Sequence, residues 1–175
     1  ARYLTGLGHR TFAFVGSDPR HRFSTARCSG VRLQLQEQGL DLRPAAVAQV
    51  DVDDPRALEI MEAALFPKTG PRPTAVVAAD EMHAVLVRHI CQEKGLEIPR
   101  DLSLISFNNS IVSTIVSPAL TSIDINARQL GIEAALQAIK HLDNPDLMPS
   151  RTLVPFQLIE RESCQATSDT EQTSA

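Results

Sequence analysis

Short apolar runs alternate along this chain with longer segments in which apolar residues recur at helical spacing. The short runs are bounded by Gly, Pro, Asn or Asp, and their length is typical of strands. They occupy residues 11–15, 45–50, 74–78, 102–107 and 120–123. A last run, 152–159, contains Pro155, which cannot donate a ladder hydrogen bond, so we expect it at an edge of the sheet.

The longer segments carry the boundary signals of helices. Gly39 follows the first of them, Pro67 ends the second, and Gly95 follows the third. The predicted helices cover residues 24–38, 54–66, 80–94 and 126–142, and residues 1–7 are typical of the last turns of a helix. Strands that alternate with such helices indicate a doubly wound α/β fold, in which a parallel sheet is covered on both faces.

Ligands of such a fold bind at the carboxyl ends of the strands. This rule selects the loops 16–23, 51–54, 79–80 and 107–117. Just after the first loop lies Arg27, whose guanidinium donors have a fixed geometry that suits hydroxyl or carboxylate ligands. Phe23 offers an aromatic face to a sugar ring. A solvated basic loop explains these two residues equally well.

Two further polar groups follow strands. Asn108 and Asn109 come directly after the run 102–107, and their amides suit sugar hydroxyls, although a turn is the simpler interpretation. Asp51, Asp53 and Asp54 follow the run 45–50 and suggest a magnesium or phosphoacceptor pocket. For these aspartates, too, the simpler interpretation is structural: a solvated turn and a helix cap.

Composition disfavours several classes of function. The 17 Lys and Arg against 21 Asp and Glu leave a net charge of -4, which disfavours direct binding to a nucleic-acid backbone. Aromatic residues make up 4% and Trp is absent, so a base-stacking surface is not expected. No apolar stretch approaches the roughly 18 residues of a membrane span. Residues 1–10 lack the apolar core of a secretory signal.

Motifs of common cofactor and catalytic sites are missing from the sequence. Neither glycine-rich nucleotide-binding pattern occurs, and there is no G-x-S-x-G. The three cysteines are widely spaced, which indicates free thiols in a reducing compartment. We therefore expect no metal, no cofactor and no catalysis. An α/β enzyme that uses the three clustered aspartates is kept as an alternative.

Four segments together resemble the effector-binding domain of the lactose-repressor family of bacterial transcription regulators. They are LGHRTFAFVG at 7–16, GLEIPRDLSLISFNN at 95–109, SPALTSIDINARQLG at 117–131 and LIERES at 158–163. Their order and spacing match the family across about residues 1–163. No single segment is specific, but the set is.

The resemblance implies a two-lobed fold of the type I periplasmic-binding-protein kind, of which this chain forms mostly the C-terminal lobe. Residues 1–123 and 152–163 would belong to that lobe, and the helix 126–142 to the N-terminal lobe. Residues 164–175 are expected to form a disordered tail, because they are polar. The family's helix-turn-helix domain has no counterpart here, so we expect operator DNA to be bound only through that missing part.

The resemblance also implies a sugar effector between the lobes. Arg27, three residues before Gly30, matches a common sugar ligand of the family. Asn108 stands where the family has an acid, and Ala79 stands before the capping Asp80 where an Asn is frequent. The expected ligand residues are Arg27, Asn108, Phe23 and Asp80. The form SFNN is similar to repressors of maltose operons, so maltose or a related glucoside is expected.

A homodimer is the remaining expectation. Ile111, Val112, Ile115 and Val116 crowd one loop, and the resemblance places this loop at a two-fold interface, together with His83 and Val87 of the helix 80–94. The whole protein would be a cytoplasmic regulator that allosterically changes operator affinity, with no membrane association. A periplasmic sugar-binding protein of a transport system has the same fold and is kept as the alternative.

Overall fold

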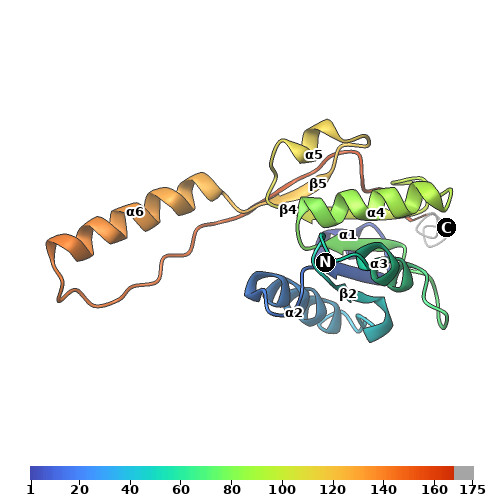
Figure 1. Cartoon of the computed structure of the whole chain (residues 1–175), viewed down its shortest axis with the longest axis horizontal. Helices are drawn as coiled ribbons and strands as arrows, with labels where there is room; N and C mark the ends of the chain where they lie inside the picture. The colour runs from blue at the N-terminus through green and yellow to red at the C-terminus, as the bar shows by residue number, and fades with distance from the viewer. Residues whose placement is uncertain (168–175) are drawn as a thin grey trace, which may run out of the picture.

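The computed structural model describes residues 1–167, and its centre is a six-stranded sheet (Figure 1). The strands are β1 (Phe12–Gly16), β2 (Val47–Gln49), β3 (Ala75–Ala78), β4 (Ser103–Phe107), β5 (Thr121–Asp124) and β6 (Gln157–Ile159). Their order across the sheet is β2-β1-β3-β4-β5-β6, and β6 is the antiparallel edge strand. The predicted parallel sheet and the predicted edge strand are confirmed.

Helices cover both faces of this sheet. They are α1 (Arg2–Gly6), α2 (Arg22–Gln36), α3 (Ala57–Leu65), α4 (Glu81–Glu93), the short α5 (Val112–Ile115), α6 (Ala127–Asp143) and a 3-10 turn, η1 (Pro44–Ala46). Successive residues of β1 point to opposite faces. Ala13 and Val15 pack with α3 and α4, whereas Phe12 and Phe14 pack with α1 and α2. The doubly wound fold is therefore confirmed.

The segment 125–156, which we call the arm, leaves the body of the protein (Figure 1). It departs after Asp124 and returns at Gln157, and these two residues are paired between β5 and β6. Within the described chain, α6 buries none of its side chains. Its apolar side chains Leu130, Ile132, Leu136, Ile139 and Leu142 are exposed instead.

The end of the chain differs from the expected domain boundaries. Residues 152–156 belong to the arm, where Nε2 of Gln137 donates to Oγ1 of Thr152 at 2.5 Å, because ladder pairing starts only at Gln157. Residues 164–167 are not a free tail. The backbone N–H of Gln165 donates to Oγ of Ser103 at 3.1 Å, which holds this segment against β4. The rest of the expected tail, 168–175, lies outside the described residues.

Two local expectations also change. α2 begins at Arg22 rather than Ser24. Ser24 does not cap the helix, because its Oγ donates a buried hydrogen bond to the Ser17 carbonyl at 3.1 Å. The loop after β4 contains α5, which the sequence did not indicate. Among the helices of residues 1–167, none is long and apolar enough to cross a membrane.

Candidate functional site

The carboxyl ends of β1, β3 and β4 surround a cavity of about 500 Å³. Its lining residues come from α2, the start of α4 and the loop after β4: Phe23, Arg27, Asp80, Glu81, Met82, Asn108, Ser110 and Val112. All four residues expected to bind the ligand are in this set. The sheet rule thus located the cavity, although the ligand roles themselves stay predictions.

Gly16 allows the elements around the cavity to approach one another. A Cβ atom at this position would lie 2.5 Å from Oγ of Ser24 and 2.7 Å from Cβ of Ala79. Both distances are shorter than real carbon contacts allow, so any side chain here would push α2 away from the end of β3. The glycine therefore keeps Arg27 of α2 within reach of the β3 and β4 ends.

Arg27 is held by contacts from both neighbouring strand ends. Its Nη1 donates to the carbonyl of Ala79, and its Nη2 donates to Oδ1 of Asn108 at 3.2 Å. The guanidinium carbon lies 4.4 Å from the ring centre of Phe107 and 5.2 Å from that of Phe23. Burial lowers the pKa of Arg27, and the charge of Asp80 opposes that shift only in part.

The two asparagines after β4 have different roles. Both have left-handed backbones, with φ of 95° at Asn108 and 57° at Asn109, a region that Asn tolerates better than most residues. Asn108 turns its amide to Arg27. Asn109 instead donates from Nδ2 to Asp124 at 3.0 Å and accepts from Nη2 of Arg161 at 2.6 Å. Asn109 therefore ties β4 to the base of the arm, and the simpler interpretation as a turn holds for its backbone.

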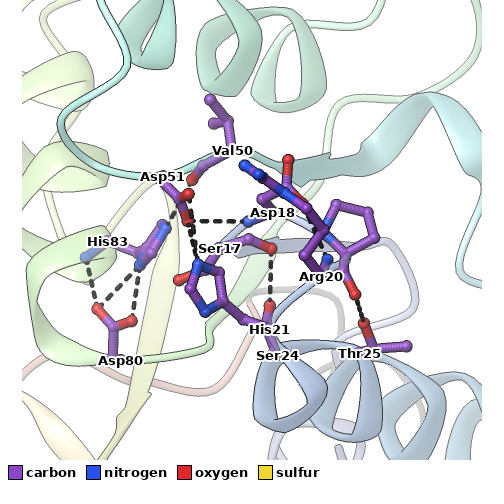
Figure 2. Close-up of polar contacts among 11 residues, drawn as sticks. Ser17, Asp18, Arg20, His21, Ser24, Thr25, Val50, Asp51, Asp80 and His83 are labelled. Atoms are coloured by element: carbon purple, nitrogen blue, oxygen red, sulfur yellow. Dashed lines mark hydrogen bonds and ion pairs between the residues drawn. The ribbon is translucent and has the colours of Figure 1, made fainter.

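Asp80 begins α4 and contacts a buried histidine (Figure 2). Oδ1 of Asp80 accepts from the backbone N–H of His83 at 3.0 Å, and Nδ1 of His83 lies 2.9 Å from the same carboxylate. Nε2 of His83 lies 3.0 Å from the carbonyl of Val50. Both ring nitrogens thus face acceptors, so the imidazole is a cation that donates from each.

Hydrogen bonds decide the pKa values of this pair. Burial alone would lower the pKa of His83, but the hydrogen bonds to Asp80 and to the Val50 carbonyl raise it above its ordinary value. Burial alone would raise the pKa of Asp80, but the hydrogen bonds from His83 lower it. Each partner therefore favours the charged form of the other.

Glu81 anchors the loop that carries α5. Its side chain is 6% exposed, and Oε1 accepts from the backbone N–H of Ser110 and from Oγ of Ser113, each at 2.6 Å. These bonds fix one wall of the cavity. Sequence reasoning missed this role, because an acid after a helix cap is ordinary and its partners are some 30 residues away.

Of the clustered aspartates, Asp51 contacts the loop after β1 (Figure 2), and Asp54 contacts its own turn. Oδ1 of Asp51 accepts from the backbone N–H of Asp18 at 3.1 Å, and Nε2 of His21 lies 3.3 Å from Asp51. Oδ1 of Asp54 accepts from the backbone N–H of Arg56 at 2.8 Å, within the turn before α3. Asp54 is not the helix cap that the sequence predicted, because α3 begins only at Ala57 and Arg56 is its N-cap. Across residues 1–167, no group of His, Cys, Asp and Glu could hold a metal ion. These contacts favour the structural interpretation of the cluster.

The expected dimer surface needs a correction. His83 is 1% exposed and Val87 is fully buried, because both pack inside their own chain beneath α4, so neither side chain can meet a partner. Val116 packs against the same core. Ile111 and Ile115, by contrast, are 70% and 71% exposed, and Val112 is half-buried beside the cavity. The exposed part of the expected patch is therefore Ile111 and Ile115.

Comparisons with known proteins agree on one family. The model of the periplasmic binding protein-like domain matches residues 1–164. Catabolite control protein A of Priestia megaterium is 31% identical over 162 residues, which cover 91% of this chain and 48% of that protein. The "Probable opine utilization operon repressor" of Rhizobium rhizogenes is 30% identical over 173 residues, with 94% of this chain and 86% of that protein covered.

A solved structure is similar over nearly the whole chain. It is the crystal structure of a LacI family transcriptional regulator from Bifidobacterium animalis subsp. lactis, with a TM-score of 0.81 and 26% identity. The match covers 95% of this chain and 59% of that one. The chain thus spans about half the length of the catabolite control protein and somewhat more of this regulator. These similar proteins are transcriptional regulators, not enzymes.

Proposed function

Because the chain belongs to the LacI family of transcriptional regulators, as its periplasmic-binding-protein-like ligand-binding domain, we propose that it senses a small sugar and controls operator binding. Maltose or a related glucoside is the first candidate, from the resemblance of the SFNN segment. The ligand occupies the cavity at the ends of β1, β3 and β4, between this lobe and a second one.

The observation that carries this proposal is the arrangement around Arg27. A guanidinium and an amide from different elements meet at one point, with aromatic rings beside them. Hydrogen-bonding groups at the edge of a ligand and aromatic carbon against its faces suit a sugar ring, which has polar edges and apolar faces. The cavity of about 500 Å³ is large enough for one or two sugar units.

Signal transmission in this proposal uses the arm. Asp124 and Gln157 mark the points where the chain leaves and rejoins the sheet. Asn109, next to the cavity residue Asn108, contacts both Asp124 and Arg161 at this crossing. A ligand that binds between the lobes would favour their closure, and closure would change the spacing of the operator-binding domains in a homodimer. Such a protein acts in the cytoplasm, where its operator is.

A periplasmic sugar-binding protein is the competing function. It has the same fold and the same kind of cavity. Similarity to a catabolite control protein and to a probable operon repressor favours transcriptional control instead.

Two measurements on the full-length protein test the proposal. Thermal unfolding with a panel of sugars should show a higher midpoint with the effector, because a ligand that binds only the folded state stabilises it. The same sugar should change the affinity for operator DNA, typically by 5- to 150-fold in regulated systems. Sugar binding without any change in DNA affinity would favour the transport protein, and the absence of any sugar response would overturn the proposal.

A further inference from the structure

Arg27 holds a positive charge that lacks a matching carboxylate. Its contacts are the neutral carbonyl of Ala79 and the neutral amide oxygen of Asn108. Among residues 1–167, no carboxylate oxygen lies within 4.0 Å of its guanidinium, whereas seven ion pairs occur elsewhere in this part of the chain, at residues other than Arg27. A half-buried cation without a counter-ion is costly unless something supplies one.

The two acids that line the same cavity are already engaged. Asp80 accepts from the backbone and the ring of His83, and the imidazolium offsets its charge. Oε1 of Glu81 accepts from Ser110 and Ser113. Either acid would lose these buried hydrogen bonds if it rotated toward Arg27, so neither forms a direct ion pair with it, although the charge of Asp80 acts on Arg27 from a distance.

The guanidinium keeps unused donors. Of its five N–H groups, one is given to Ala79 and one to Asn108, and the others are unpaired within the described chain. Arginine and a carboxylate form a charge-assisted pair, frequently with two parallel bonds. The free donors beside the cavity therefore match the carboxylate of a ligand better than a neutral hydroxyl group.

We propose that the effector carries a carboxylate that binds Arg27, so that the ligand is a sugar acid rather than a neutral sugar. This inference rests on the proposed function, because it concerns the ligand of the same cavity. A monoanion fits better than a phosphate ester, since Arg27 is the one cation among the lining residues and the carboxylates of Asp80 and Glu81 would repel a dianion.

Asn108 is then the residue that determines this specificity. Its Oδ1 lies 3.2 Å from Nη2 of Arg27, where an aspartate oxygen would form an ion pair within the protein. With the amide, the positive charge stays available to the ligand. Asn108→Asp is nearly isosteric and places an anion where the ligand carboxylate would find its partner, so it should disfavour acids.

Matched ligand pairs test the proposal by titration calorimetry on the full-length protein. The probes are glucose with glucuronate, which differ by a carboxylate at C6, and maltose with maltobionate and cellobiose with cellobionate, in which the acid also has its reducing-end ring opened. We expect at least one acid to bind about 10- to 100-fold more tightly than its neutral partner, the range of a hydrogen bond to a charged group. Raising the salt concentration should weaken the acid more than the neutral sugar.

Variants of Arg27 and Asn108 show whether the carboxylate of the ligand acts through these two residues. Asn108→Asp should reduce the acid-to-neutral affinity ratio by about tenfold or more, and Arg27→Ala should bring it near one. Gln92→Glu, an exposed change near the other end of α4 that adds the same charge, should leave the ratio unchanged. Equal or tighter binding of the neutral sugar by the unmodified protein overturns the inference and leaves sugar sensing intact. The absence of binding by every probe overturns both.

Discussion

His83, which is buried, and Asp80, which is partly exposed, form an ion pair three residues apart, in which Nδ1 of His83 lies 2.9 Å from the Asp80 carboxylate. The second ring nitrogen lies 3.0 Å from the carbonyl of Val50, so the imidazole joins the start of α4 to the end of β2. Since Asp80 also lines the cavity, His83 fixes the position and the charge of a residue at the candidate site.

This pair should make stability fall as the solution becomes alkaline. The pKa of His83 is raised above its ordinary value of 6.5, so the stabilisation from its proton is complete below about pH 6.5 and is lost as pH rises through the folded-state pKa. As pH rises from about 6.5 through the folded-state pKa, the free energy of unfolding should therefore decrease, by at most about 1.4 kcal/mol per pH unit for one proton. Urea unfolding at a series of pH values measures this slope.

Two variants test whether His83 causes the decrease in unfolding free energy with rising pH. His83→Gln cannot carry the proton and should flatten the curve above pH 6.5. His9→Gln is the control. Burial lowers the pKa of His9, so this residue changes stability only below about pH 6.5, where its contribution is lost as pH decreases. A slope above pH 6.5 that survives in His83→Gln would show that another group is responsible.

At low pH the same pair affects stability in the opposite direction, because its contribution is lost as pH falls. The pKa of Asp80 is below its ordinary value of 3.8, so its contribution is present above about pH 4 and disappears as pH falls through the folded-state pKa. The pair is therefore most stabilising between about pH 4 and 6.5.

Arg27→Ala should weaken effector binding with only a small loss of stability. The side chain is half-buried and packs against Phe23 and Phe107, so we expect its removal to cost about 1 kcal/mol in unfolding free energy. Affinity should fall 10- to 100-fold, since a charged hydrogen bond contributes about 1.5–3 kcal/mol. Calorimetry with the best-binding probe checks the affinity, and an unchanged dissociation constant would exclude Arg27 from the site.

Glu81 offers a prediction about the cavity wall. Glu81→Ala removes both acceptor contacts of Oε1 and leaves the N–H of Ser110 and the hydroxyl of Ser113 unpaired, so it should cost about 2–3 kcal/mol of unfolding free energy. Glu81→Gln keeps an oxygen in place and should cost about 1 kcal/mol. Amide exchange at Ser110 should accelerate in the alanine variant and not in the glutamine variant. Equal costs for the two variants would mean that the oxygen contacts do not hold α5.

Local signals made most of the fold predictable. The runs at 74–78 and 102–107 are rich in aliphatic residues and became the central strands β3 and β4, and the Asp80 cap marked the start of α4. Pro155 indicated an edge strand, although β6 starts only after it. Arg27 and Asn108 were found because strand ends of a parallel sheet converge, a rule that needs no knowledge of contacts.

Long-range contacts were what the sequence could not show. His83 has the spacing of an ordinary helix residue, and only its contact with Val50, 33 positions away, makes it an interior cation. The link from Glu81 to Ser113 spans 32 positions. Such pairs depend on how the loops pack over the sheet, and helical periodicity carries no information about that packing.

The final prediction concerns association through the loop that contains α5. Ile111 and Ile115 are 70% and 71% exposed, while Ser113 between them is hydrogen-bonded to Glu81, so a loop fixed at its centre presents two large aliphatic side chains to solvent. Exposed apolar side chains on a fixed surface are typical of interfaces, and a two-fold axis there would bring the same loop of each subunit together. Replacing both isoleucines with Asp should give soluble monomers in sedimentation experiments, because the new charges would face each other across the axis. Thr114→Asp, a single exposed change in the same loop, should weaken association less, and unfolding curves should show that both variants stay folded. A double variant that sediments as the unmodified protein does would place the subunit contact elsewhere.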